Sequence, residues 1–228
     1  MGLKQMIERS FSLLRASLRS VRQRFFSLLS PPCDDRIPAG PQRLLGPWEQ
    51  GWALDIYSHH AASTWQHTEI GRLILKYKYR GRIDLADRLA DRILALMEQH
   101  TDLKAIDAIV PVPPSTERLY DPVSLLGQVL ARRLGVPLLN GALRKTRATA
   151  RQKDMRTRAH KRANVAGVFT VQSNVRGKSL LVLDDLYDSG ETLKEVTRVL
   201  KRAGARSVKV LALARTRYYE RTALGSPQ

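Results

Sequence analysis

The chain has 228 residues, 43% of them hydrophobic, and a formal net charge of +18 at pH 7. This length suits one domain of ordinary size with extensions, and the longest apolar runs are too short to cross a bilayer. The single cysteine, Cys33, excludes a disulfide framework and a Cys-based zinc site, and it fits a reducing, cytoplasmic compartment.

The first 30 residues read as a basic amphipathic helix. Apolar residues recur at spacings of three and four from Leu3 to Leu29, and the arginines lie on the other faces of the predicted helix. The apolar side could lie on a membrane surface, on the body of the protein or on a partner protein. Prolines mark residues 31–45 as a linker, and we expect the folded body to begin near Gly46.

The body alternates strands and helices. We expect strands at residues 51–58, 105–113, 136–139, 165–171, 179–185 and 207–215. We expect helices at residues 68–81, 84–97, 123–135 and 191–203. This order predicts an α/β fold with a mostly parallel central sheet flanked by helices.

Two segments concentrate the positive charge. Residues 1–30 hold six Lys or Arg against Glu8, and residues 142–162 hold nine against Asp154. Their net charges of +5 and +8 supply 13 of the 18 charges. Such a concentration predicts a polyanionic partner, which could be the phosphates of a small molecule, of nucleic acid or of lipid headgroups.

The most informative stretch runs from Leu180 to Leu193 and reads LLVLDDLYDSGETL. Its apolar strand ends in Asp184 and Asp185, and ligands bind beyond the carboxyl ends of strands in open α/β sheets. The following strand-to-helix turn offers backbone N–H groups to a phosphate, and Gly190 lets the backbone approach the anion closely. Acids suited to hydroxyls, followed by N–H groups suited to phosphate, predict a pocket for a phosphorylated sugar.

A capping box is the alternative interpretation of the same turn. Asp188 would be the helix N-cap and Glu191 its partner at N3, with no ligand at all. This alternative leaves the pair Asp184–Asp185 and the position of Gly190 without a reason, because paired carboxylates at the end of a buried strand are costly without partners.

The same stretch resembles the ribose-phosphate signature of type I phosphoribosyltransferases: an apolar strand, two acids and a small-residue turn containing Gly-x-Thr. Four further blocks resemble the ComF-type (competence protein F-like) branch of that family. They are LILKYKYRGRIDLADRLA, DAIVPVP, LRKTRATARQKDMRTRAHKRANVAGVF and LALARTR. The blocks keep the family's order over roughly residues 68–217.

The resemblance implies a role for each matching position. Asp184 and Asp185 would hold the ribose hydroxyls of phosphoribosyl pyrophosphate (PRPP), and Asp188 would lie near the incoming base, so these three are the candidate catalytic residues. The implied PRPP-binding set is Asp184, Asp185, Asp188, Ser189, Gly190, Glu191 and Thr192. The implied pyrophosphate-binding set has two parts. Pro113, Pro114 and Ser115 follow Val112, and Arg144, Lys145 and Arg147 lie in the basic segment 142–162. Mg²⁺ would be bound through PRPP, with no metal held by the protein alone.

The resemblance also implies a domain plan. Residues 46–103 would form a helical hood and the N-terminal part of the domain, residues 104–220 the phosphoribosyltransferase-like core, and residues 221–228 a tail. The basic segment 142–162 would hold a mobile loop that closes over the leaving pyrophosphate and excludes water. Read without the family, the same segment could be a solvated basic loop or a nucleic-acid contact.

Three features depart from the family pattern. Cys33 stands alone where ComF-type proteins usually carry a Cys-rich zinc ribbon ahead of this domain. The stretch PSTERLYDPVS replaces the usual basic residues after the first VPVP strand, which puts the pyrophosphate contacts there in doubt. Asp188 and Glu191 bring negative side chains to a phosphate cradle, where Asp188 could accept a proton from the nucleophile or serve as a plain helix cap.

Three functions fit the sequence. The first is an enzyme that transfers phosphoribose from PRPP to an unidentified nitrogen nucleophile. The second is a catalytically silent PRPP-binding module that acts in DNA uptake or repair and contacts nucleic acid through its basic segments. The third is a protein tethered to a membrane surface by residues 1–30.

Overall fold

A computed structural model of the chain describes residues 40–61, 64–115, 120–150 and 157–216. The predicted N-terminal helix and the predicted tail lie outside these ranges. The chain divides into two compact units, residues 1–38 with 59–66, and residues 39–58 with 67–228. Most of the hairpin of β3 (Ser58–Ala61) and β4 (Thr64–His67) belongs to the first unit. The central sheet and the candidate site belong to the second.

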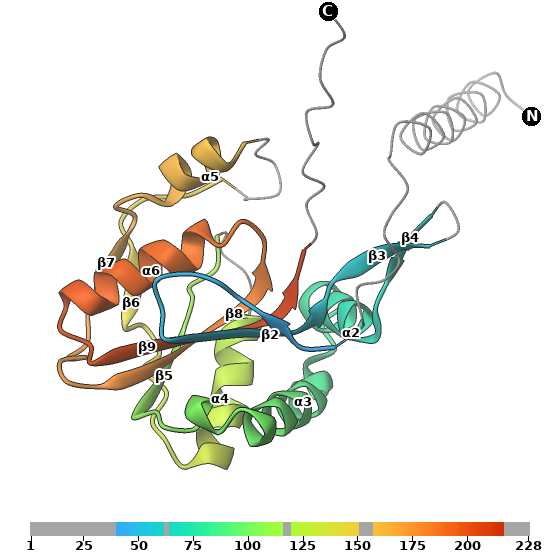
Figure 1. Ribbon diagram of the computed structural model, residues 1–228, viewed down its shortest axis with the longest axis horizontal. Helices are drawn as coiled ribbons and strands as arrows, with labels where there is room; N and C mark the ends of the chain where they lie inside the picture. The colour runs from blue at the N-terminus through green and yellow to red at the C-terminus, as the bar shows by residue number, and fades with distance from the viewer. Residues whose placement is uncertain (1–39, 62–63, 116–119, 151–156, 217–228) are drawn as a thin grey trace, which may run out of the picture. The chain divides into compact units, whose positions relative to one another are not determined.

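A five-stranded sheet in the order β1-β2-β9-β8-β5 forms the centre of the second unit (Figure 1). Its strands are β1 (Gln42–Arg43), β2 (Gln50–Ile56), β5 (Ala108–Pro111), β8 (Ser179–Tyr187) and β9 (Ser207–Arg215). β1 pairs antiparallel with β2, and the other pairings are parallel. The predicted mostly parallel sheet is therefore confirmed.

Five α-helices accompany the sheet in the described part of the chain. They are α2 (Glu69–Tyr79), α3 (Ala86–Gln99), α4 (Pro122–Leu134), α5 (Arg158–Val165) and α6 (Glu191–Arg202). Short 3-10 turns, Ile83–Leu85 and Thr101–Leu103, flank α3. The four helices predicted from the sequence are confirmed within two residues at each end. None of the described helices is long and apolar enough to span a bilayer.

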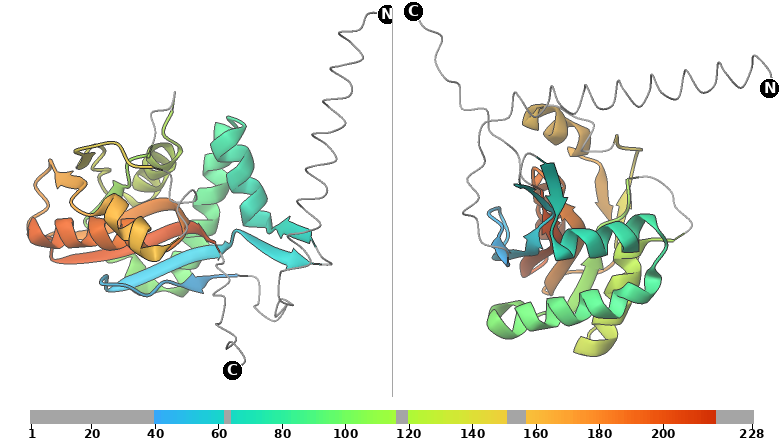
Figure 2. Two further views of the ribbon diagram at one scale, coloured as in Figure 1. Left: turned by 90° about the horizontal axis from the view of Figure 1, so that it is seen from above. Right: turned by 90° about the vertical axis from the view of Figure 1, so that its right-hand side faces the viewer.

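Strand β8 is apolar from Leu180 to Leu183 because both of its faces are covered there. Leu181 and Leu183 pack into a core with α2, α3 and α4, whereas Leu180 and Val182 pack into a second core with α6. Figure 2 shows these helices on opposite faces of the sheet. Two buried layers fix the position of β8, and with it the acidic residues at its carboxyl end.

Local signals in the sequence set the helix ends. The hydroxyl of Thr68 accepts a hydrogen bond from the Gly71 N–H at 2.9 Å, and the Asp121 carboxylate accepts one from the Val123 N–H at 3.0 Å. α4 ends at Gly135, whose φ of 67° is left-handed and therefore suits glycine.

Three expectations about the elements need correction. Residues 136–139 form no strand, and only an isolated bridge joins Leu138 to Ile109. In the strand predicted at 165–171, Val165 is the last residue of α5 and residues 166–167 form a turn. Only β7 (Phe169–Val171) is extended, paired antiparallel with β6 (Leu143–Lys145). β1 lies inside the predicted linker, and because Leu44 is buried the folded body begins before Gly46.

The expected mobile loop over residues 142–162 is also partly ordered structure. β6 occupies its start and the first turns of α5 occupy its end. Residues 151–156 lie outside the described ranges. The helix α5 escaped prediction because its short sequence is highly charged, and Thr157 caps it by accepting a hydrogen bond from the His160 N–H at 3.2 Å.

Candidate functional site

A pocket of about 380 Å³ lies at the carboxyl ends of β5 and β8. The Val112 N–H donates to the Leu183 carbonyl at 2.9 Å, so the segment after β5 begins beside the acidic end of β8. The pocket brings together predicted residues from three parts of the chain: Val112, Pro113, Pro114, Ser115, Lys145, Asp184, Asp185, Asp188, Ser189, Gly190 and Thr192. Glu191, Arg144 and Arg147 do not line it.

The two acids at the end of β8 have different surroundings. Asp185 forms an ion pair with Lys78 at the end of α2, and attraction to this carboxylate outweighs burial and raises the pKa of Lys78. Burial, reinforced by repulsion from Asp185, raises the pKa of Asp184 to about 7. Lys78, Lys145 and the Asp185 N–H oppose that rise. Around neutral pH the Asp184 carboxyl therefore titrates beside the ion pair of Asp185 and Lys78.

Lys145, the last residue of β6, supplies a cation to the pocket. Its ammonium donates to the Pro114 carbonyl and to the Thr149 hydroxyl, each at 3.2 Å. Burial lowers its pKa, although the nearby Asp184 opposes the change. The side chain is thus fixed beside Pro113–Ser115, the segment that the resemblance assigns to pyrophosphate.

The turn between β8 and α6 offers uncapped backbone groups. Gly190 is the N-cap of α6 with φ of 78°, and no side chain caps the helix. Glu191 is the first helical residue and not the third, so the capping-box interpretation of this turn is wrong. A Cβ atom on Gly190 would meet the Tyr187 hydroxyl at 2.5 Å. Glycine is therefore favoured here both by the left-handed φ angle and by the position of the Tyr187 ring.

The two acids of this turn are both paired with cations. The Asp188 carboxylate accepts from the Lys161 ammonium at 2.7 Å and from the Thr216 hydroxyl at 2.9 Å. Glu191 pairs with Arg158 at 3.0 Å and with Lys194 at 2.9 Å, and these cations outweigh burial and lower its pKa. The negative side chains that depart from the family pattern are therefore neutralised within the structure.

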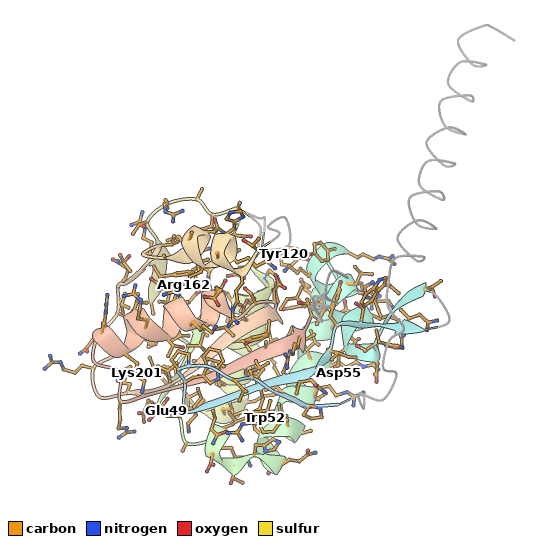
Figure 3. All side chains as sticks on the ribbon, turned by 45° about the horizontal axis from the view of Figure 1, so that its top comes forward. Glu49, Trp52, Asp55, Tyr120, Arg162 and Lys201 are labelled. Atoms are coloured by element: carbon orange, nitrogen blue, oxygen red, sulfur yellow. The ribbon has the colours of Figure 1, made fainter. Side chains whose placement is uncertain are left out.

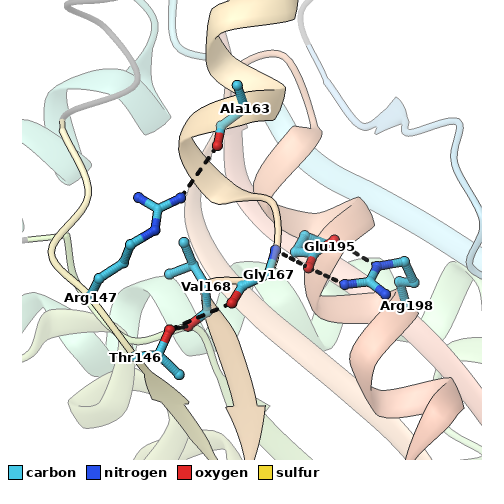
Figure 4. Close-up of polar contacts among 7 residues, drawn as sticks. All are labelled: Thr146, Arg147, Ala163, Gly167, Val168, Glu195 and Arg198. Carbon is cyan, nitrogen blue, oxygen red and sulfur yellow. Dashed lines mark hydrogen bonds and ion pairs between the residues drawn. The ribbon is translucent and has the colours of Figure 1, made fainter.

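Arg144 and Arg147, the two arginines that the resemblance assigns to pyrophosphate, lie outside the pocket. Arg144 is exposed on β6. Arg147 donates to the Ala163 carbonyl on α5 at 3.4 Å, and the neighbouring Thr146 hydroxyl donates to the Val168 carbonyl at 3.1 Å (Figure 4). In this structure Arg147 holds the chain against α5, and the role of both arginines at pyrophosphate stays a prediction.

Sequence reasoning missed several polar residues of the site, among them Lys78, Lys161 and Thr216. Lys78 lies in the block KYKYRG, whose resemblance to the family was the signal that could have found it. Lys161 and Thr216 reach Asp188 from α5 and from the residue after β9. Both lie in blocks that resemble the family, but only the fold shows that they meet at the turn.

Comparison with known proteins agrees with the fold. Residues 124–223 match the phosphoribosyl transferase domain family. A DNA utilization protein YhgH from Salmonella typhi is 30% identical over 213 residues, covering 87% of this chain and 88% of that protein. The competence protein F of Haemophilus influenzae is 28% identical over 154 residues, covering 63% of this chain and 66% of that protein.

Among solved structures, adenine phosphoribosyltransferase from Saccharomyces cerevisiae aligns with a TM-score of 0.42 and 15% identity, covering 69% of this chain and 82% of that one. The sheet, the family match and the extended YhgH similarity together define a protein of the phosphoribosyltransferase family. Within that family, the chain belongs to the ComF-type branch.

Proposed function

We propose that the pocket binds PRPP together with Mg²⁺, and that the protein transfers ribose 5-phosphate to a nitrogen nucleophile. The observation that carries this proposal is the meeting of the Asp184–Asp185 pair, the uncapped turn at Gly190 and the Lys145 ammonium in one pocket. Each feature suits a different part of one ligand: hydroxyls, a terminal phosphate and a pyrophosphate.

The orientation of PRPP follows from these features. The ribose hydroxyls donate to Asp184 and Asp185. The 5-phosphate lies at the N-terminus of α6, where the N–H groups after Gly190 and the helix dipole favour an anion. The pyrophosphate lies against Lys145 and the segment Pro113–Ser115.

The residues of the pocket fit a metal that arrives with the ligand. Within the described ranges, no three His, Cys, Asp or Glu side chains are placed to hold a metal ion by themselves. Asp184 and Asp185 nevertheless offer carboxylate oxygens beside the proposed ribose position, which suits the preference of Mg²⁺ for a few carboxylates plus phosphate oxygens. When bound, Mg²⁺ would neutralise charge on the pyrophosphate.

The proposed reaction breaks the bond between ribose C1 and pyrophosphate and forms a bond from C1 to nitrogen. The bonding electron pair leaves with pyrophosphate, and Lys145 stabilises the charge that develops there. The nucleophile supplies the new electron pair and loses a proton. Each oxygen of Asp188 accepts one hydrogen bond and keeps a further lone pair, so this carboxylate is the candidate acceptor of that proton.

Pyrophosphate release measured with PRPP, Mg²⁺ and a panel of nitrogen bases tests the enzymatic proposal. Transfer predicts release that depends on one of the bases and is lost in Asp184→Asn with Asp185→Asn. PRPP binding with no release for any base would instead favour a catalytically silent PRPP-binding module.

A second candidate function, contact with nucleic acid, is favoured by a basic groove between α5 and α6. Its basic lining residues are Arg158, Arg162, Lys194, Arg198, Lys201 and Arg202. Arg162 and Arg202 are exposed and, within the described part of the chain, form no ion pair with a carboxylate. Figure 3 shows Arg162 on α5 and Lys201 near the end of α6.

A filter-binding or anisotropy titration with single-stranded DNA tests this second function. Affinity should fall steeply with salt, because phosphate contacts release counterions. Arg162→Ala with Arg202→Ala should weaken binding about tenfold at low salt, whereas Arg132→Ala with Arg176→Ala, which removes two exposed arginines outside the groove, should have less effect. Equal losses in both variants would rule out the groove as the contact surface.

A further inference from the structure

Lys161 is the feature of the structure that the proposed reaction does not use. It lies on α5, and its side chain is only 2% exposed. Burial of a lysine is costly unless its charge is paired, and here the partner is Asp188 at 2.7 Å. A cation has therefore been buried against the first acid of the turn that would hold the 5-phosphate.

The electrostatics of that turn explain why a buried cation matters. Asp188 precedes Gly190 by two residues and lines the pocket, so an uncompensated carboxylate there would repel a phosphate at the N-terminus of α6. Lys161 does not line the pocket itself. It contacts one oxygen of the Asp188 carboxylate, and the Thr216 hydroxyl donates to the other.

The same helix also compensates the second acid of the turn. Arg158, one turn before Lys161 on α5, pairs with Glu191. Its side chain is 70% exposed, so this contact is screened by solvent and weaker than the buried one. α5 therefore carries a countercharge for each acid of the turn, and Lys161 is the stronger of the two.

We propose that Lys161 is a positioning residue for the 5-phosphate site: it neutralises Asp188 and holds the turn in a form that accepts an anion. This inference rests on the proposed function, because it assumes that the turn binds the phosphate of PRPP. It goes beyond it by assigning part of the phosphate affinity to a residue on α5 that never touches the ligand.

Calorimetric titration with ribose 5-phosphate tests the proposal, with pyrophosphate as a probe for the other end of the pocket. Lys161→Met should weaken ribose 5-phosphate binding about tenfold or more, because it leaves Asp188 uncompensated beside the phosphate. Pyrophosphate affinity should change much less. Adding Asp188→Asn to Lys161→Met should restore ribose 5-phosphate affinity to within about threefold of the Asp188→Asn single variant.

The outcomes separate this inference from the proposed function. If the unmodified protein binds neither PRPP nor ribose 5-phosphate, the proposed function fails. If it binds both and Lys161→Met binds ribose 5-phosphate equally well, Lys161 has no positioning role and the inference is overturned. A folded Lys161→Met protein that loses affinity equally for ribose 5-phosphate and pyrophosphate would also overturn it, because the effect would then be general rather than local to the turn.

Discussion

At the scale of single residues, the pocket is a set of acids matched to cations from distant parts of the chain. Lys78 reaches Asp185 from α2, Lys161 reaches Asp188 from α5, and Lys145 approaches Asp184 from β6. A phosphorylated ligand that enters this pocket therefore meets partly neutralised acids together with the cations that suit its phosphates.

The raised pKa of Asp184 predicts a pH-dependent stability. Between about pH 4 and pH 7 the folded protein keeps a proton that the unfolded chain releases, so the free energy of unfolding should fall as pH rises through this window. Asp184→Asn should remove that fall. Urea denaturation at several pH values measures it, with the exposed Asp102→Asn as the matched control. An unchanged pH profile in Asp184→Asn would contradict the assignment.

Lys145 should carry much of the affinity for pyrophosphate. Lys145→Ala removes a fixed ammonium from the pocket wall and should weaken pyrophosphate binding about tenfold or more. Arg132→Ala, an exposed cation on α4 outside the pocket, is the control. The single variants Arg144→Ala and Arg147→Ala should lose less pyrophosphate affinity than Lys145→Ala. A larger loss in either arginine variant, measured by calorimetry, would show that the arginines bind pyrophosphate more strongly than Lys145 does.

At the scale of elements, the site depends on how β8 passes into α6. Strand β8 is packed between two hydrophobic cores and carries Asp184 and Asp185 near its carboxyl end. Helix α6 begins after Gly190, whose φ is left-handed, and no side chain caps its first N–H groups. This junction places groups for hydroxyls and groups for phosphate within one short stretch, so its geometry decides whether a sugar phosphate fits.

Gly190→Ala tests this junction against Gly135→Ala. Both glycines have left-handed φ, which costs a residue with a Cβ about 1–2 kcal/mol. An added Cβ at Gly135 meets nothing within 4 Å, whereas at Gly190 it meets the Tyr187 ring. Thermal or urea unfolding should therefore show a larger loss of stability for Gly190→Ala. Equal losses would mean that the Tyr187 ring moves aside freely.

Much of this junction could be predicted from the sequence, because the apolar run, the acid pair and Gly190 are adjacent in the chain. The helices followed from the 3.6-residue periodicity of their apolar residues. β1, β6 and α5 are short and gain their stability from partners far along the chain, so their local sequences carry little signal. For the same reason Lys161 and Thr216 could not be placed beside Asp188 before the fold was known.

At the scale of the whole molecule, α5 contributes basic side chains to two features. Lys161 reaches the turn of the pocket, and Arg158 and Arg162 line the groove along α6. The pocket and the groove can be probed separately, because the basic side chains that line the groove do not line the pocket.

The central claim is that the pocket binds PRPP, and calorimetric titration with PRPP in the presence and absence of Mg²⁺ tests it most directly. The unmodified protein should bind PRPP, and Mg²⁺ should tighten the binding. Asp184→Asn with Asp185→Asn should abolish binding while circular dichroism shows that the chain stays folded. Equal PRPP affinity in the unmodified protein and this double variant would contradict the account.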